Sequence, residues 1–219
     1  MFKIVRVPAI LDPFFGSLTK KFHWKQGDYF RLLVLAIAMA YGRRNVSNLY
    51  RYIDAVTHRT RFNNFFLVGR WDGPDRLRTK ADELLADLEL KPGERVYLIV
   101  DDSVSRKRGK RMEGVGYLHD PVHGGSVLGH QYVTAVIKAR GVIIPFGIRL
   151  YVKKELAQTG HARAVDVAFR TLTEMAALLV REFVPPAGVE VMVLFDSYYL
   201  CPKVVDACRE KGFHYVSVL

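Results

Sequence analysis

The order of the segments after residue 93 constrains the fold of this chain more than any other feature of its sequence. By hydrophobic pattern they run strand, strand, strand, helix, strand, helix, strand. They are residues 95–104, 131–139, 142–152, 162–183, 190–195, 202–212 and 214–219. Strands joined by a short turn pair antiparallel, whereas strands separated by a helix pair in parallel through a right-handed crossover. The order therefore predicts an α/β fold, a mixed sheet with flanking helices.

The strand order within this sheet follows from one proline. Pro145 lies inside the third strand, and proline is tolerated in a sheet mainly at an edge. The third strand then lies outside the second, and the fourth and fifth strands add on the other side of the first. We predict five strands in the order 3-2-1-4-5, with the first and fourth as parallel neighbours. Their nearly continuous apolar runs, Val96–Val100 and Val191–Phe195, predict burial on both faces.

The part before residue 93 has a helical pattern instead. The expected helices are residues 28–40, 45–53 (with Asn45 or Ser47 as its N-cap), 58–68 and 75–88. The change falls near Lys91-Pro92-Gly93, which predicts a helical region over 1–93 and a second domain over 94–219. The helical region carries 16 basic and 9 acidic side chains, so it is markedly basic. Its arginines are consistent with a solvated surface or with a DNA-facing one.

The composition excludes several classes of protein. Half of the residues are hydrophobic and 25% are charged, as in globular domains and not in disordered or collagen-like chains. Two cysteines exclude a disulfide framework and a Cys-rich zinc site. The longest apolar run, residues 32–41, is far shorter than the roughly 20 residues of a membrane-spanning helix. No signal peptide is recognisable, so we expect a cytoplasmic protein. The net charge of +11 favours a polyanionic partner.

Two aspartates stand at the ends of the strands predicted to be parallel neighbours. Asp102 ends the first strand and Asp196 ends the fourth. Because adjacent strands lie about 4.8 Å apart, carboxylates at the same edge can converge. Two carboxylates held close together repel each other, and a divalent cation relieves that repulsion. The alternative is structural: Asp102 caps the loop that follows it, and Asp196 caps the helix opened by Pro202.

A basic run follows the first strand directly. Its cationic residues are Arg106, Lys107, Arg108, Lys110 and Arg111. The run leaves the same end of the sheet as Asp102, so a phosphate backbone lying over the carboxylates would meet it. Lysines and arginines in such a place position DNA without reading its sequence.

Taken together, these motifs resemble those of a known family. They are Asp101-Asp102-Ser103, Lys107-Arg108-Gly109-Lys110, Gly129-His130 and Phe195-Asp196, in that order. They are similar to the motifs of the DDE transposases of bacterial insertion sequences, in the branch with an Asp-Asp-Ser/Thr motif. The segment 42–49, with Arg43 and Arg44, and the segment Phe65-Phe66…Trp71 resemble the family's helical DNA-binding region. The resemblance thus covers essentially the whole chain.

The resemblance implies a ribonuclease H-like core and a function in DNA transposition, by metal-dependent phosphodiester hydrolysis and strand transfer at the element's ends. It implies that Asp102, which immediately precedes the serine, and Asp196 are catalytic ligands of two Mg²⁺ or Mn²⁺ ions. The implied partners are double-stranded DNA, as element ends and target, and further copies of the chain on that DNA. The family's third catalytic residue, a glutamate on a helix after the fifth strand, has no counterpart up to Leu219. We therefore expect a truncated transposase.

Two alternative functions remain open at this point. The first is a non-catalytic DNA-binding fragment, which would act as an inhibitor or be an inert remnant. The second is a small ribonuclease H-like nuclease. The nuclease hypothesis takes its further carboxylate from Glu174, on the predicted helix 162–183. Glu174 lies opposite the apolar stripe of that helix and four residues after Arg170, a spacing that also suits a surface ion pair.

Overall fold

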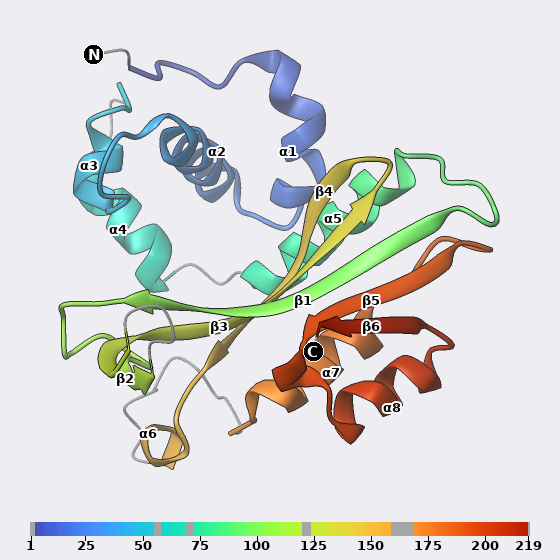
Figure 1. The fold of residues 1–219 in the computed structure, drawn as a ribbon. Helices are drawn as coiled ribbons and strands as arrows, with labels where there is room; N and C mark the ends of the chain where they lie inside the picture. Colours follow the sequence, from blue (N-terminus) through green and yellow to red (C-terminus); the bar gives the residue numbers. More distant parts are fainter. Residues whose placement is uncertain (1–2, 55–57, 69–71, 120–123, 159–168, 219) are drawn as a thin grey trace. The chain divides into compact units, whose positions relative to one another are not determined.

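The structure of the chain is a computed structural model, which describes residues 3–54, 58–68, 72–119, 124–158 and 169–218 (Figure 1). The chain divides into two units, Met1–Lys80 and Ala81–Leu219. The division falls inside helix α5, Gly73–Ala86, because Ala81 and Leu85 belong to the hydrophobic core of the second unit. None of the described helices is both long and apolar enough to cross a lipid bilayer.

The first unit consists of helices around an aromatic-rich core. The elements before α5 are η1 (Ala9–Leu11), α1 (Asp12–Thr19), α2 (Trp24–Met39), α3 (Val46–Tyr50) and α4 (Arg59–Val68). The four predicted helices are present as α2 to α5, whereas η1 and α1 were not predicted. Asn45 caps α3 as expected, since its side chain accepts a hydrogen bond from the amide of Asn48. The buried core residues are Ile4, Leu33, Ala36, Ala40, Leu49, Ile53, Phe62 and Phe65.

The second unit contains a six-stranded mixed sheet. Its strands are β1 (Arg95–Arg106), β2 (Gly116–His119), β3 (Ser126–Ala139), β4 (Val142–Tyr151), β5 (Glu190–Asp196) and β6 (His214–Val218). The five predicted strands neighbour one another as β4-β3-β1-β5-β6. The predicted five-stranded order is incomplete, however, because β2 also pairs with β3. β3 begins earlier than predicted, and its first residues, from Ser126 to Gly129, provide the edge for β2.

The strand directions agree with the connections. β1 and β3 are antiparallel, as are β3 and β4, whereas β5 is parallel to β1 and to β6. Among the described strands β4 pairs only with β3, so it is an edge strand, as Pro145 predicted. Pro145 lies opposite Val136, where the register shifts between Ala135 and Val136. This arrangement makes β1 and β5 parallel neighbours in the middle of the sheet.

The helices of the second unit differ from prediction at one boundary. Besides the end of α5 they are α6 (Lys154–Gln158), α7 (Leu172–Glu182), η2 (Ser197–Tyr199) and α8 (Pro202–Glu210). The helix predicted over 162–183 does not extend through 169–171, because Thr171 is extended and forms a capping box with Glu174. The rest of that predicted stretch, up to residue 168, lies outside the described residues.

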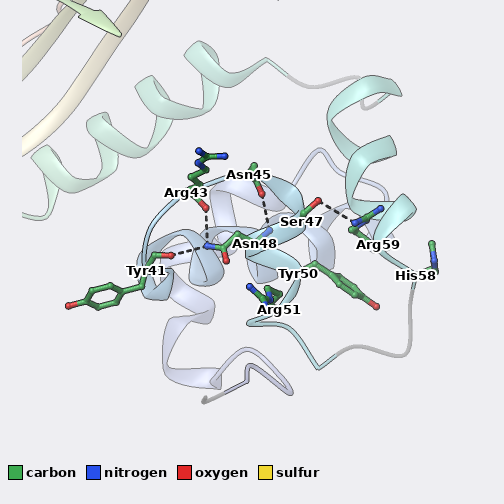
Figure 2. Close-up of a pocket in the computed structure, with 9 residues that line it drawn as sticks. All are labelled: Tyr41, Arg43, Asn45, Ser47, Asn48, Tyr50, Arg51, His58 and Arg59. Atoms are coloured by element: carbon green, nitrogen blue, oxygen red, sulfur yellow. Dashed lines mark hydrogen bonds between the residues drawn. The ribbon is translucent and has the colours of Figure 1, made fainter. Parts of the chain in front are cut away.

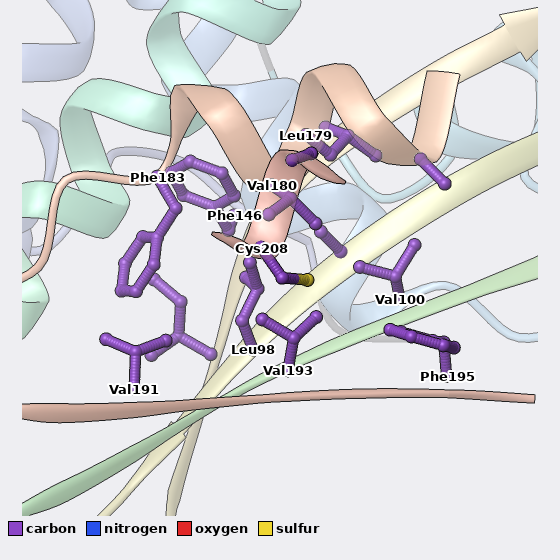
Figure 3. Close-up of a cluster of buried hydrophobic side chains, with 14 of the residues drawn as sticks. Leu98, Val100, Phe146, Leu179, Val180, Phe183, Val191, Val193, Phe195 and Cys208 are labelled. Carbon is purple, nitrogen blue, oxygen red and sulfur yellow. The ribbon is translucent and has the colours of Figure 1, made fainter. Parts of the chain in front are cut away.

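The core of the second unit lies between the sheet and α7 and α8 (Figure 3). Leu98 and Val100 of β1 and Val193 and Phe195 of β5 point into it, under Val180 of α7. Burial alternates along Val96–Val100 and Val191–Phe195: every second residue is buried, and those between are half-buried. The prediction that both faces of these runs are buried is therefore wrong, because the side chains of one face are only half-buried.

Candidate active site

Two aspartates lie just beyond the last paired residues of β1 and β5. The parallel pairing ends with Ile99 and Leu194, and the same register extended by two residues brings Asp101 opposite Asp196. Side chains alternate between the faces of a sheet, and Val100 and Phe195 both point into the core. Asp101 and Asp196 therefore share the opposite face, and both are exposed. Their carboxylates are thus available to a ligand from solvent.

The side chain of Asp102 lies on the core side of β1, because successive side chains of a strand point to opposite faces. It makes two side-chain hydrogen bonds there. The hydroxyl of Tyr199 donates to its Oδ1 at 2.8 Å. The amide of Gln131, on β3, donates to its Oδ2 at 2.7 Å. The backbone amide of Asp102 donates to Oδ1 of the neighbouring Asp101 at 2.8 Å. The half-buried carboxylate of Asp102 thus joins β1 to β3 and to the segment that follows β5.

Tyr199 is a hydrogen-bond donor in this arrangement. It lies in η2, the short helix that follows Asp196, and its side chain is 0% exposed. Burial raises the pKa of Tyr199 well above its usual value, and the hydrogen bond to Asp102 and the charges of Asp102 and Asp196 raise it further. The phenol consequently stays protonated at neutral pH and keeps donating to Asp102.

The structural alternative for the two aspartates, capping, is wrong. Asp196 precedes η2 but makes no side-chain capping bond, and Cys201 is the N-cap residue of α8. The side-chain partners of Asp102 are Tyr199 and Gln131 rather than the amides of the loop that follows β1. The convergence of Asp102 and Asp196 on one cation stays a prediction, and the register favours Asp101 as the residue that faces Asp196.

The sequence already contained a signal for Asp101. Val96, Leu98 and Val100 recur with period two, so an apolar phase of β1 was visible, and Asp101 lies out of that phase. That signal was obscured because Tyr97 and Ile99 make the run look continuously apolar. Nothing in the local sequence identified Gln131 and Tyr199 as hydrogen-bond partners of Asp102. Gln131 lies 29 residues from Asp102 along the chain, and Tyr199 lies 97 residues from it.

The exposed pair of carboxylates fits a magnesium or manganese ion. Magnesium is usually held by one or two carboxylates together with waters and substrate phosphates. Asp101 and Asp196 provide oxygen donors of this kind from adjacent strands. Within the described residues no group of three or more His, Cys, Asp and Glu side chains is placed to hold a metal ion. The described side chains therefore fit an ion that takes its remaining ligands from water or from a phosphate.

The predicted basic run begins at the last residue of β1, four residues beyond Asp102. Arg106 is the last residue of the strand, and Arg108, Lys110 and Arg111 are exposed in the connection to β2. Lys107 is half-buried and donates from Nζ to Oγ of Ser105 at 2.9 Å. These cations follow Asp101 by five to ten residues in the sequence.

The first unit has a polar surface hollow of its own, of about 710 Å³ (Figure 2). It is lined by Tyr41, Arg43, Asn45, Ser47, Asn48, Tyr50, Arg51, His58 and Arg59. The side-chain amide of Asn48 donates to the carbonyls of Tyr41 and Arg43, both at 2.9 Å, and so fixes the loop before α3. Of the two arginines predicted to bind DNA, Arg43 lines the hollow, whereas Arg44 donates from Nε to the carbonyl of Ile37.

Glu174 has a structural role in the first turn of α7. Its Oε2 accepts from the amide of Thr171 and its Oε1 pairs with Lys203 at 2.6 Å. The bond from Lys203, followed by those from Thr171, lowers the pKa of Glu174 to about 2. Lys203, rather than Arg170, is thus its ion-pair partner among the described residues. A carboxylate engaged at both oxygens does not favour the hypothesis that Glu174 is a metal ligand.

Comparison with known sequences identifies one family. The model of the DDE superfamily endonucleases matches residues 13–219, nearly the whole chain. No curated protein sequence matches.

Similar solved structures include three complexes of Mos1. The strand transfer complex is 16% identical with a TM-score of 0.25, over 98% of this chain and 60% of that one. The paired-end complex with the left transposon end is also 16% identical, with a TM-score of 0.21, over 98% and 61% of the chains. The mariner paired-end complex with Mn is 13% identical with a TM-score of 0.21, over 95% and 68%. The chain thus spans 60% of the length of the first of these. The assignment to a family rests on the sequence match alone.

Proposed function

Because the chain belongs to the DDE superfamily endonucleases, we propose that it breaks and rejoins the backbone of double-stranded DNA in transposition. The observation that carries the proposal is the position of three carboxylates just beyond the paired residues of two parallel, adjacent strands: Asp101 and Asp102 within β1, and Asp196 at the end of β5. A basic segment follows β1 in the sequence. The strand order β4-β3-β1-β5-β6 supports a ribonuclease H-like core. The element would be an insertion sequence, and the chain would act in the cytoplasm as an oligomer on its DNA.

In the proposed site the aspartates would hold a divalent cation next to the DNA backbone. A bound Mg²⁺ or Mn²⁺ supplies Lewis-acid polarisation and lowers the pKa of a bound water, and two ions share these tasks in related chemistry. Asp196 and an aspartate of the Asp101-Asp102 pair provide the negative charge that binds the cation. The motif assigns this role in β1 to Asp102 and the register favours Asp101.

The basic surfaces are the proposed DNA contacts. Arg106, Lys107, Arg108, Lys110 and Arg111 would hold the backbone next to the carboxylates. Arg43 in the hollow of the first unit, with Arg44 beside it, would contribute a second contact. Lysine and arginine contacts to phosphates make binding strongly dependent on salt, which distinguishes them from solvated surface charges.

A nicking assay tests the proposed function. Supercoiled plasmid is incubated with the full chain in Mg²⁺, in Mn²⁺ or in EDTA, and the nicked form is quantified. We expect metal-dependent nicking that falls by about 100-fold or more in Asp196→Asn, because the amide lacks the charge that binds the cation. Asp206→Asn is the matched control, since Asp206 is an exposed aspartate of α8 that pairs with Arg209 on the same helix.

Two outcomes would contradict the proposal. Nicking that persists in EDTA, or that Asp196→Asn leaves unchanged, would show that these carboxylates do not bind the catalytic ion. Salt-dependent DNA binding without any nicking would instead favour the alternative of a non-catalytic DNA-binding protein.

A further inference from the structure

The two adjacent aspartates of β1 differ in their surroundings. Asp101 is exposed on the face that it shares with Asp196. Asp102 is half-buried on the core face, where Tyr199 and Gln131 occupy one oxygen each. We infer that Asp102 is a positioning residue. Its hydrogen bonds with Tyr199 and Gln131 form a clamp, and this clamp keeps Asp101 and Asp196 in fixed positions relative to each other. This inference rests on the proposed function of the same site.

The clamp joins the three segments that determine the distance between Asp101 and Asp196. Asp102 follows Asp101 in β1, and Tyr199 follows Asp196 by three residues in η2. The hydrogen bond of 2.8 Å between Tyr199 and Asp102 therefore connects β1 to the segment that follows β5, beyond Ile99 and Leu194, where the pairing of β1 with β5 stops. Gln131 connects Asp102 to β3 on the other side. Backbone pairing holds Asp101 and Asp102 to β3 and Asp196 to β6, and the bond from Tyr199 adds a side-chain link between the β1 and β5 segments beyond Ile99 and Leu194.

The buried surroundings make this connection rigid. Tyr199 has no exposed surface and belongs to the core of the second unit together with Phe195 and Val204. A buried hydroxyl with a single carboxylate acceptor loses that partner at a cost, so the bond persists. Asp102 would then act through hydrogen bonds, whereas Asp101 would act through its charge.

This difference predicts opposite responses to isosteric substitution. Asparagine at position 102 still accepts from Tyr199 through Oδ1, and its Nδ2 can donate to Gln131 once the glutamine amide turns over. Asparagine at position 101 keeps the shape but loses the charge that a cation needs. Asp102→Asn should consequently preserve metal-dependent nicking, whereas Asp102→Ala and Asp101→Asn should impair it.

The experiment compares these variants in the full chain. Mn²⁺ binding is measured by electron paramagnetic resonance, and plasmid nicking is measured as a function of Mn²⁺ concentration. We expect Asp101→Asn to lose about 100-fold or more of nicking at every Mn²⁺ concentration. Asp102→Asn should stay within about threefold of the wild type, while Asp102→Ala and Tyr199→Phe should need about 10- to 100-fold more Mn²⁺ for half-maximal rate. Their maximal rates should recover at high Mn²⁺.

Controls separate positioning from folding and from failure of the proposed function. Tyr198→Phe removes the hydroxyl of the neighbouring, exposed tyrosine and should change nothing. Thermal unfolding identifies any variant that has lost its fold. The inference would be overturned if Asp102→Asn lost as much nicking activity as Asp101→Asn. It would also be overturned if Tyr199→Phe lowered the maximal rate without changing the Mn²⁺ concentration needed for half-maximal rate. A wild-type chain that neither binds Mn²⁺ nor nicks DNA would refute the proposed function itself, and the inference with it.

Discussion

Gly147 of β4 lies directly against Leu179 of α7, so that a Cβ atom at position 147 would overlap Cδ2 of the leucine. Leu179 is 1% exposed and is one of the core residues that fix α7 on the sheet. The absence of a side chain at position 147 is therefore what lets the helix approach the edge strand. This close approach sets the packing of the element that covers the core face of β1, where Asp102 lies.

Gly147→Ala should destabilise the chain. The buried leucine must move to make room for the new methyl group, and overpacking of this kind costs about 1–3 kcal/mol of the free energy of unfolding. Urea unfolding followed by circular dichroism measures it. Gly16→Ala is the control, because nothing lies within 4 Å of a Cβ at that helical position. An unchanged stability in Gly147→Ala would show that α7 does not depend on this close approach.

The ion pair between Glu94 and Arg140 should make stability depend on pH in acid. Arg140 donates to both oxygens of Glu94, at 2.9 and 2.7 Å. The side-chain bond from Arg140, followed by the amide of Lys91, lowers the pKa of Glu94 to about 2 from 4.5. A folded-state pKa below the unfolded one gives stability that is present above pH 4.5 and is lost as the pH falls towards 2.

Glu94→Gln isolates this contribution. We expect the wild type to be the more stable protein at neutral pH, and its advantage over Glu94→Gln to shrink between pH 4.5 and 2. Urea midpoints at a series of pH values measure the difference. Arg140→Lys, which keeps the positive charge but not the paired donors, should give a smaller dependence. A constant difference between wild type and Glu94→Gln across that range would contradict the assignment.

Neutralising the connection between β1 and β2 should weaken DNA binding for all sequences alike. In the triple variant Arg108→Gln, Lys110→Gln and Arg111→Gln we expect the slope of log affinity against log salt to fall by about 0.9 for each phosphate that the variant no longer neutralises. Fluorescence anisotropy with two duplexes of unrelated sequence measures the DNA affinity and the slope of its salt dependence. Lys138→Gln is the control, since Lys138 is exposed near the other end of β3, opposite Tyr97. An equal effect of Lys138→Gln would mean that only net charge matters.

Glu174→Gln should leave nicking unchanged within about twofold, because glutamine also serves at the third position of a capping box. Thr171→Ala removes the other half of the box and should cost about 1 kcal/mol of stability, measured by thermal unfolding. Abolished nicking in a folded Glu174→Gln variant would instead support the hypothesis of a small nuclease that uses this glutamate.

The sequence by itself determined the order of the elements and the edge of the sheet. Periodicity and proline chemistry are local properties, so the helical first part, the succession of strands and the edge position of Pro145 were all predictable. It also placed Asp196 and the Asp101-Asp102 pair on neighbouring parallel strands, since such connections bring these strands together. The position of Asp102 at the end of its strand was wrong, because pairing with β3 extends β1 to Arg106. These predictions needed no knowledge of which side chains meet across the fold.

Only the tertiary structure decided which aspartate faces which way. The alternation of β1 is local, but the face that is buried depends on where α7 packs, and this separates Asp101 from Asp102. The partners of Asp102 come from β3 and from η2, 29 and 97 residues away, where no sequence pattern announces them. The extra strand β2 and the start of α7 at Leu172 likewise depend on pairing and capping. Such interactions depend on distances in space, which the spacing of residues along the chain does not define.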